Sequence, residues 1–183
     1  LFACGEVVWG LHGACRKGGN ALSECLVFGR IAGRQAARLA AESDRGTWRN
    51  SQPQCENAGG KFSAASPRAL RRRMADLAWR CAGVVREAEG LDRGLAELDD
   101  AAMQVRALPV ASARDRRVRA DLSSMRRVLQ VILAASRARR ESRGCFLRKD
   151  HPLEDDRNWL KNSRVQLSGD AGEPVVDHLA AAR

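Results

Sequence analysis

Apolar residues recur at steps of three and four positions over residues 20–42, the spacing that places side chains on one face of a helix. Asn20 is a residue type that favours helix N-caps, and Gly29 and Gly33 on the same face would allow another backbone to approach closely. The pattern therefore predicts a long helix over 20–42 with one buried face. The residues of that face are Leu22, Cys25, Leu26, Gly29, Ile31, Ala32, Ala36 and Leu39.

The same spacing returns in three segments between residues 67 and 140. Ser66–Pro67 supplies an N-cap and a proline at the first helical position. The first helix is expected to end near Glu89–Gly90, the second before Pro109 and the third near Arg140. Three amphipathic helices with short joins predict an antiparallel three-helix bundle. The apolar stripes are Leu70, Met74, Leu77, Cys81, Val84 and Val85, then Leu91, Leu95, Leu98, Ala102 and Val105, then Val118, Leu122, Met125, Leu129, Ile132 and Leu133.

The segments outside these helices carry other signals. Leu1 to Cys4 is a short apolar run that predicts a buried strand, and a core strand at this place predicts further sequence before it. Glycines then recur too often over 5–19 for a helix or strand interior. Residues 46–66 are polar and turn-rich, which predicts a linker between two units.

The helical spacing is lost after residue 140. A short strand is expected at Ser163–Leu167, and the last fifteen residues are expected to be irregular. The fold class is therefore an α-rich chain of the α+β kind. A short strand, a Gly-rich loop and a long helix fill 1–45, and after the linker the bundle of 67–140 precedes an irregular tail over 141–183.

The charge balance is strongly basic, with 32 Lys and Arg against 22 Asp and Glu in 183 residues. Such a surface suits phosphates, acidic partners or anionic substrates. The clustered arginines lie mostly off the apolar stripes, and aromatic residues make up 4% with no tyrosine, so base stacking is disfavoured. We expect a solvated face and no nucleic acid partner. The arginines are Arg71, Arg72, Arg73, Arg116, Arg117, Arg119, Arg126 and Arg127.

The six cysteines are scattered without a CxxC pair, which favours reduced thiols over a disulfide framework. The three histidines are equally scattered, so no metal site is expected in this chain alone. No stretch approaches 18 uninterrupted apolar residues, so no spanning helix is predicted. The cysteines are Cys4, Cys15, Cys25, Cys55, Cys81 and Cys145.

Candidate chemistry gathers in the Gly-rich segment. Glycines flank His12, Arg16 offers a planar fork for a carboxylate, and the helix beginning at Asn20 presents free N–H groups and a positive dipole end. Glu6 could accept hydrogen bonds from sugar hydroxyls. These residue types fit an anionic ligand near Asn20, and they fit equally a glycine-rich turn that only packs closely.

Two separated blocks resemble the C-terminal part of the fumarate reductase/succinate dehydrogenase flavoprotein family, which includes L-aspartate oxidase. The first block resembles the family's FAD-binding stretch and comprises Gly5-Glu6, His12-Gly13-Ala14, Arg16, Gly18-Gly19-Asn20-Ala21-Leu22 and Phe28-Gly29-Arg30. The second comprises Glu141-Ser142-Arg143-Gly144 and Asp155-Asp156-Arg157-Asn158-Trp159-Leu160-Lys161. The three helices between the blocks are similar to the family's helical domain in order and spacing.

The resemblance implies roles for individual residues. Glu6 would hold the FAD ribose, and Asn20, Ala21 and Leu22 would bind the cofactor, the backbone of the last two meeting the flavin pyrimidine edge. Arg16 would be the catalytic clamp on a substrate carboxylate.

For His12 two roles stay open, shaping the loop or contacting flavin or substrate. The chain departs from the family's pattern at Cys15, Lys17 and Phe146, which stand where the family has Asn, Leu and His.

The resemblance also implies an enzyme, an FAD-dependent oxidoreductase acting on C4 dicarboxylates. The alternatives are L-aspartate oxidase and a non-catalytic remnant whose helices bind a partner. No GxGxxG motif is present for the ADP half of FAD, so residues 1–183 alone are expected neither to bind FAD tightly nor to turn over substrate. An iron–sulfur subunit is the expected partner, and the expected location is cytoplasmic, at the inner face of the membrane through that partner. The segment 141–183 is expected to pack back on the FAD domain.

Overall fold

The computed structural model describes residues 1–8, 11–42, 66–167 and 172–180. The chain divides into two units, residues 1–54 and 55–183. The division falls within the predicted linker 46–66, of which only Ser66 is among the described residues.

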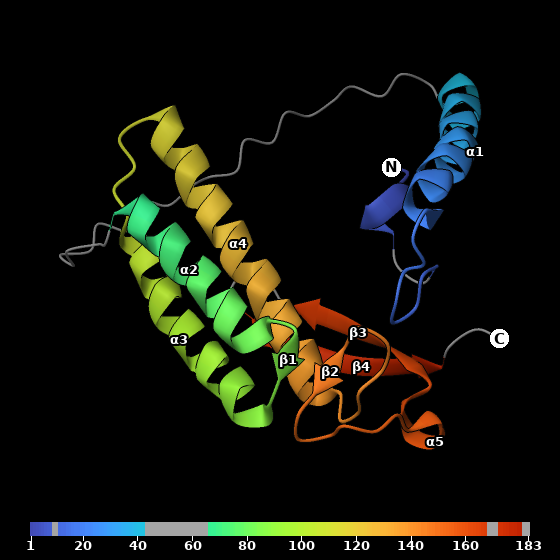
Figure 1. Ribbon diagram of the computed structural model, residues 1–183. Helices are drawn as coiled ribbons and strands as arrows, with labels where there is room; N and C mark the ends of the chain where they lie inside the picture. Colours follow the sequence, from blue (N-terminus) through green and yellow to red (C-terminus); the bar gives the residue numbers. More distant parts are fainter. Residues whose placement is uncertain (9–10, 43–65, 168–171, 181–183) are drawn as a thin grey trace. The chain divides into compact units, whose positions relative to one another are not determined.

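In the described part of the first unit, a short 3₁₀ helix precedes one long helix, which is labelled α1 in Figure 1. The 3₁₀ helix η1 spans Gly5–Val7, and α1 spans Asn20–Glu42, which confirms the helix predicted over 20–42. The strand predicted at Leu1 to Cys4 is wrong. Cys4 has extended dihedral angles (φ −154°, ψ 162°), but the described part of this unit contains no strand to complete its hydrogen bonds.

The apolar face of α1 is exposed, in contrast to the buried face that its spacing predicts. Leu22 is 70% exposed, Leu26 67% and Leu39 51%. The reason is that η1, the element that packs on α1 in this unit, is three residues long and covers little of a helix of 23 residues.

Three helices form the body of the second unit: α2 (Pro67–Ala82), α3 (Ala88–Ala107) and α4 (Ala113–Ala138). They lie side by side in Figure 1, and each packs against the other two. This confirms the predicted three-helix bundle. The buried core is Leu70, Met74, Leu77, Cys81, Leu91, Leu98, Ala101, Val105, Leu108, Leu122, Leu129 and Leu133.

Side-chain caps mark the beginning of α2 and of α4. The Ser66 hydroxyl accepts from the Ala69 amide at 3.2 Å, with Pro67 in the first turn. In α4, Ser112 and Asp115 form a capping box, each side chain accepting from the other's backbone. Both arrangements satisfy amides that a helix start leaves without partners.

The first bundle helix ends at Ala82, not near Glu89–Gly90 as predicted. A short strand β1 (Val85–Arg86) interrupts the helical run and pairs in parallel with β2 (Leu147–Arg148). As a result, Val84 and Val85 point away from the core, and they are 64% and 57% exposed. Since α2 ends at Ala82 and β1 occupies Val85–Arg86, α3 begins at Ala88, earlier than expected.

The tail is more regular than predicted. After the short helix α5 (Asp156–Trp159), β3 (Lys161–Leu167) pairs antiparallel with β4 (Pro174–Ala180), and both strands pack on α4. The strand predicted at Ser163–Leu167 is confirmed. The prediction of irregular last residues is wrong for 174–180, because a long-range partner completes the hydrogen bonds of a segment whose own periodicity is weak.

One of the arginines expected on a solvated face is buried. Arg126 has an exposed fraction of only 9% and donates to Gln130, so it is not part of that face.

The described cysteines include three with free thiols, Cys4, Cys25 and Cys81, whereas Cys55 lies outside the described residues. Within the described ranges, no helix combines the length and apolar character that a membrane crossing needs.

Candidate functional site

The loop before α1 turns on glycines in the left-handed region. Gly13 has φ +58° and Gly19 has φ +85°, conformations that other residues adopt at a cost. No atom lies within 4 Å of the place where a Cβ would stand at either residue. The glycines are therefore needed for backbone conformation, and they leave open space beside the loop.

One side-chain contact ties this loop to the helix. His12 Nε2 lies 2.5 Å from Glu24 Oε2, and the Glu24 side chain is only 5% exposed. Glu24 is buried one turn beyond Asn20, on the helix that Asn20 begins. Sequence reasoning missed Glu24. A signal was present, because a carboxylate within an apolar run needs a polar partner when it is buried.

A cavity of about 290 Å³ opens between the loop and the first turns of α1. Of the predicted site residues, His12 and Asn20 line it, and Glu6, Arg16, Ala21 and Leu22 do not. The lining residues are Leu11, His12, Asn20, Ser23, Glu24, Val27 and Phe28.

The other predicted residues lie on the surface around this helix start. Glu6 is exposed on η1, and Arg16 is exposed in the loop beside Lys17. Ala21 and Leu22 belong to the first turn of α1, where amides have no partner within the helix. The Asn20 amide already donates to the Lys17 carbonyl at 3.4 Å. Two exposed cations and a helix N-terminus make this region attractive to an anion.

These residues fit the flavin that the resemblance implies. A flat cofactor needs open backbone, and the loop glycines leave space while Leu22 is 70% exposed in the first helical turn. Glu6 offers an exposed carboxylate for sugar hydroxyls.

In the described part of the chain, no three His, Cys, Asp or Glu residues gather as metal ligands.

The second motif block forms an ionic cluster around one buried carboxylate in the other unit. Glu141 is fully buried, accepts two hydrogen bonds of 3.0 Å from Arg143 and one of 3.1 Å from the Asp155 amide, and also pairs with Arg139. Arg143 also donates a hydrogen bond to the Asp156 carboxylate at 2.6 Å. Burial alone would raise the pKa of Glu141, but the Arg143 hydrogen bonds, the Asp155 amide and the two arginine charges hold it below its usual range. The cluster joins the two halves of this motif block, so its residues have a structural role.

The helical unit and the two motif blocks define the α-rich C-terminal part of a flavoprotein. A family model described as "Fumarate reductase flavoprotein C-term" matches residues 71–181. The chain belongs to the fumarate reductase/succinate dehydrogenase flavoprotein family.

The similar curated proteins include L-aspartate oxidases and fumarate reductase flavoprotein subunits. An L-aspartate oxidase of Mycobacterium leprae is 36% identical, covering 92% of this chain and 31% of that protein. A fumarate reductase flavoprotein subunit of Haemophilus influenzae is 29% identical, covering 97% of this chain and 32% of that protein. The chain thus spans about a third of the length of these two relatives.

Solved structures show the same architecture. A variant of Escherichia coli quinol fumarate reductase FrdA matches with a TM-score of 0.81 and 25% identity, covering 98% of this chain and 33% of that one. The apo form of the Mycobacterium smegmatis Sdh1 complex matches with a TM-score of 0.80 and 26% identity, covering 100% and 33%. These matches confirm the α-rich fold class.

Proposed function

We propose that this chain is the C-terminal part of an FAD-dependent flavoprotein that interconverts succinate and fumarate. The observation that carries the proposal is the arrangement at the start of α1. The His12–Glu24 hydrogen bond fixes a glycine-rich loop against the helix, and that loop exposes Arg16. An exposed guanidinium on a loop held beside a helix N-terminus suits a dicarboxylate.

In this proposal the cofactor residues are Glu6, Asn20, Ala21 and Leu22. Glu6 accepts hydrogen bonds from the ribose hydroxyls, and the open amides of Ala21 and Leu22 donate to the flavin pyrimidine edge. When bound, FAD supplies the hydride exchange that links succinate and fumarate. The positive end of α1 stabilises negative charge at that edge.

Arg16 clamps a substrate carboxylate through two parallel charge-assisted hydrogen bonds, which fixes the orientation of the substrate. For His12, the bond to buried Glu24 supports the role of shaping the loop, because its Nε2 is already engaged. The other ring nitrogen is left for any contact with substrate.

L-aspartate oxidase is the second candidate. Two relatives of that name, from Mycobacterium leprae and Rhodospirillum rubrum, are 36% identical, against 29–31% for the fumarate reductase flavoprotein subunits of Haemophilus influenzae and Mycobacterium tuberculosis. Aspartate also carries two carboxylates, so Arg16 would serve either substrate.

The complete flavoprotein, carrying this chain as its C-terminal part, tests the proposal through fumarate reduction and aspartate oxidation. The double variant Arg16→Lys/Lys17→Leu should lower kcat/KM on the true substrate by about 100-fold or more, equivalent to about 3 kcal/mol, with FAD still bound. Lys17→Leu alone is the matched control and should keep activity. Glu6→Ala should release FAD first. Wild-type kcat/KM on both substrates in the double variant would make Arg16 a structural residue and overturn the proposal.

The partner proposal is an iron–sulfur subunit that holds the flavoprotein at the cytoplasmic face of the membrane. Its support is that similar solved structures are quinol fumarate reductase and an Sdh1 complex. Co-purification of the complete flavoprotein with an iron–sulfur protein in the membrane fraction is the expected result.

The alternative of a non-catalytic remnant has a different outcome. It would be supported by a complete protein that holds no FAD and shows neither fumarate reduction nor aspartate oxidation.

A further inference from the structure

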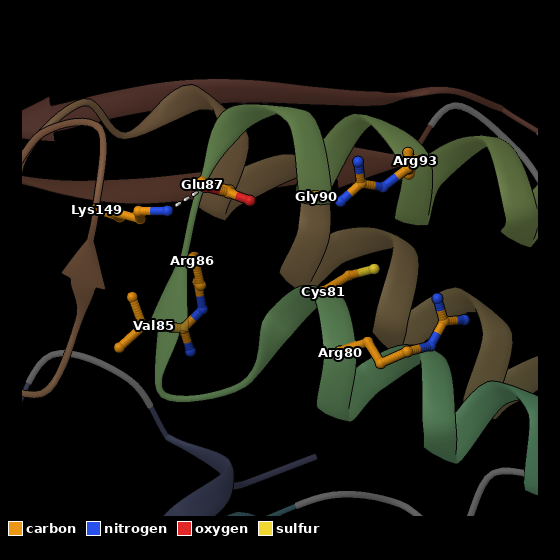
Figure 2. A pocket seen from close by; sticks show the side chains of 8 residues that line it. All are labelled: Arg80, Cys81, Val85, Arg86, Glu87, Gly90, Arg93 and Lys149. Atoms are coloured by element: carbon orange, nitrogen blue, oxygen red, sulfur yellow. Dashed lines mark hydrogen bonds and ion pairs between the residues drawn. The ribbon is translucent and has the colours of Figure 1, made fainter.

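A second cavity lies in the helical unit, where the end of α2, strand β1 and the start of α3 meet. It measures about 180 Å³, several times the roughly 30 Å³ that one water occupies in the liquid. Figure 2 shows the eight lining residues, four of which are basic. They are Arg80, Cys81, Val85, Arg86, Glu87, Gly90, Arg93 and Lys149.

Three of its four cations already have a carboxylate partner. Arg80 donates to Glu97 at 3.0 Å, Arg93 to Glu89 at 2.5 Å and Lys149 to Glu87 at 3.5 Å. Figure 2 marks the Lys149–Glu87 contact at one side of the cavity. These pairs neutralise the rim, so the charge balance of the cavity depends on the fourth cation.

Arg86 is that fourth cation, and two of the three nitrogens of its guanidinium lack acceptors. Its Nε and Nη1 atoms are buried and have no hydrogen-bond partner. Burial and the positive charge of Arg148 both lower the pKa of the Arg86 guanidinium. A buried polar group without a partner costs about 1–3 kcal/mol, and more when it is charged. Arg86 is therefore a site of unmet hydrogen bonding.

The surroundings of Arg86 restrict what can meet this demand. Its Cζ lies 4.9 Å from the centre of the Phe146 ring, so the aromatic ring covers one face of the guanidinium. Stacking uses the face and leaves the N–H edge, which is the edge that carboxylate and phosphate oxygens contact. The contact with the Phe146 ring therefore orients the Arg86 guanidinium without occupying its N–H donors.

The start of α3 adds a second source of positive potential. The Ala88 amide already donates to the Asp150 carboxylate at 3.0 Å, and Glu89 lies in the same first turn, so these two carboxylates offset part of that potential. Gly90, in the same first turn, lines the cavity and brings no side chain into it. A helix of 20 residues presents its positive dipole end here.

We propose that this cavity is a binding site for a small oxyanion, held by the edge of Arg86 and the first turn of α3. Phosphate and a small carboxylate share this chemistry, and the cavity has room for either. The residues involved belong to none of the predicted flavin or substrate contacts, so this proposal and the proposed function stand or fall separately.

Binding can be measured on the chain of residues 1–183 by calorimetry and by the shift in unfolding temperature. Inorganic phosphate and succinate are the two probes, with sodium chloride added to keep the ionic strength constant. We expect saturable binding of at least one probe with a Kd of about 1 mM or tighter, and the tighter probe identifies the source of the oxyanion.

Arg86→Gln is the decisive variant, because it keeps a polar side chain and removes the charged fork. It should weaken binding about tenfold or more. Arg86→Lys keeps the charge and should restore only part of the affinity. The matched control is Arg68→Gln, an exposed arginine in the first turn of α2, far from the cavity at the other end of that helix; it should bind as wild type.

Circular dichroism confirms that each variant is folded before binding is measured. The proposal is overturned if neither probe binds, if Arg86→Gln binds as tightly as wild type, or if chloride competes as well as the probes do. An equal loss of affinity in Arg68→Gln and Arg86→Gln would also overturn it, because the effect would then come from net charge and not from this cavity.

Discussion

His12 and Glu24 stand twelve positions apart in the chain, and their side chains meet with Nε2 and Oε2 2.5 Å apart. Glu24 contributes the buried partner, with a side chain that is 5% exposed, and His12 contributes the loop. A buried carboxylate needs a compensating hydrogen bond. The pair therefore holds the glycine-rich loop at the start of α1, where the proposed substrate clamp Arg16 is exposed.

Replacement of Glu24 by Ala should loosen this loop. Without the acceptor, His12 loses the contact that ties residues 11–19 to the helix, at a cost of about 1–3 kcal/mol in local stability. Hydrogen exchange of the loop and first-turn amides should therefore accelerate by about tenfold or more. Glu42→Ala, at the exposed end of the same helix, is the control and should leave these amides unchanged. Equal exchange in both variants would show that the pair does not hold the loop.

Arg148 should be among the most sensitive residues of the helical unit. It is 1% exposed, and it donates to the carbonyls of Ser136 and Arg139 at 2.6 and 2.7 Å and to both Asp150 oxygens. Arg148→Met would leave the two carbonyls without this donor and Asp150 with only its hydrogen bond from the Ala88 amide. This loss should cost about 3–5 kcal/mol in the free energy of unfolding. Urea denaturation measures the loss. The exposed Arg157→Met should change stability by less than about 0.5 kcal/mol, and a similar loss in both variants would contradict this account.

Acid should destabilise the helical unit through Asp150 and Glu141. The Arg148 hydrogen bonds lower the pKa of Asp150, and the pKa of Glu141 is also below its usual range because its hydrogen bonds outweigh the effect of burial. The unfolded chain, with carboxyl pKa values of about 4, then takes up protons before the folded chain does. The stabilisation is fully present well above pH 4 and is lost as the pH falls below it.

The measurement is the urea midpoint between pH 7 and pH 3. It should be nearly constant down to about pH 5 and then fall. Asp150→Asn should be less stable at pH 7 and should lose less on acidification. An identical pH dependence in wild type and Asp150→Asn would exclude Asp150 as a source of the effect.

Gly94 lies at a close approach between the bundle helices. A Cβ there would stand 3.0 Å from Cys81 Cβ and 3.1 Å from a methyl group of Leu133. Gly94→Ala should therefore destabilise the unit by about 1–3 kcal/mol through overpacking, despite the better helix propensity of alanine. Gly90→Ala, in the same helix, has its nearest neighbour at 3.7 Å and is the control. Thermal unfolding should show a lower midpoint for Gly94→Ala and an unchanged or higher one for Gly90→Ala.

Local sequence determined the helices. The apolar spacing and the caps at Ser66 and Ser112 act within a few residues, so α1, the three bundle helices and most of their core follow from short-range patterns. The residue types around Arg16 and Asn20 likewise marked a possible anion site without any knowledge of distant parts of the chain. The family resemblance extended this to roles for Glu6, Ala21 and Leu22, which stay predictions.

Tertiary structure decided what depends on partners far apart in the chain. Val84 and Val85 have the right spacing for a helix stripe, but pairing of Val85 with Leu147 makes this segment a strand. The segment 174–180 is a strand because β3 pairs with it. Glu24 and Arg86 show the same limit at the level of side chains. The buried Glu24 carboxylate has a partner in His12, whereas two nitrogens of Arg86 are buried without one. The difference depends on distances between side chains, which the spacing of residues along the chain does not encode.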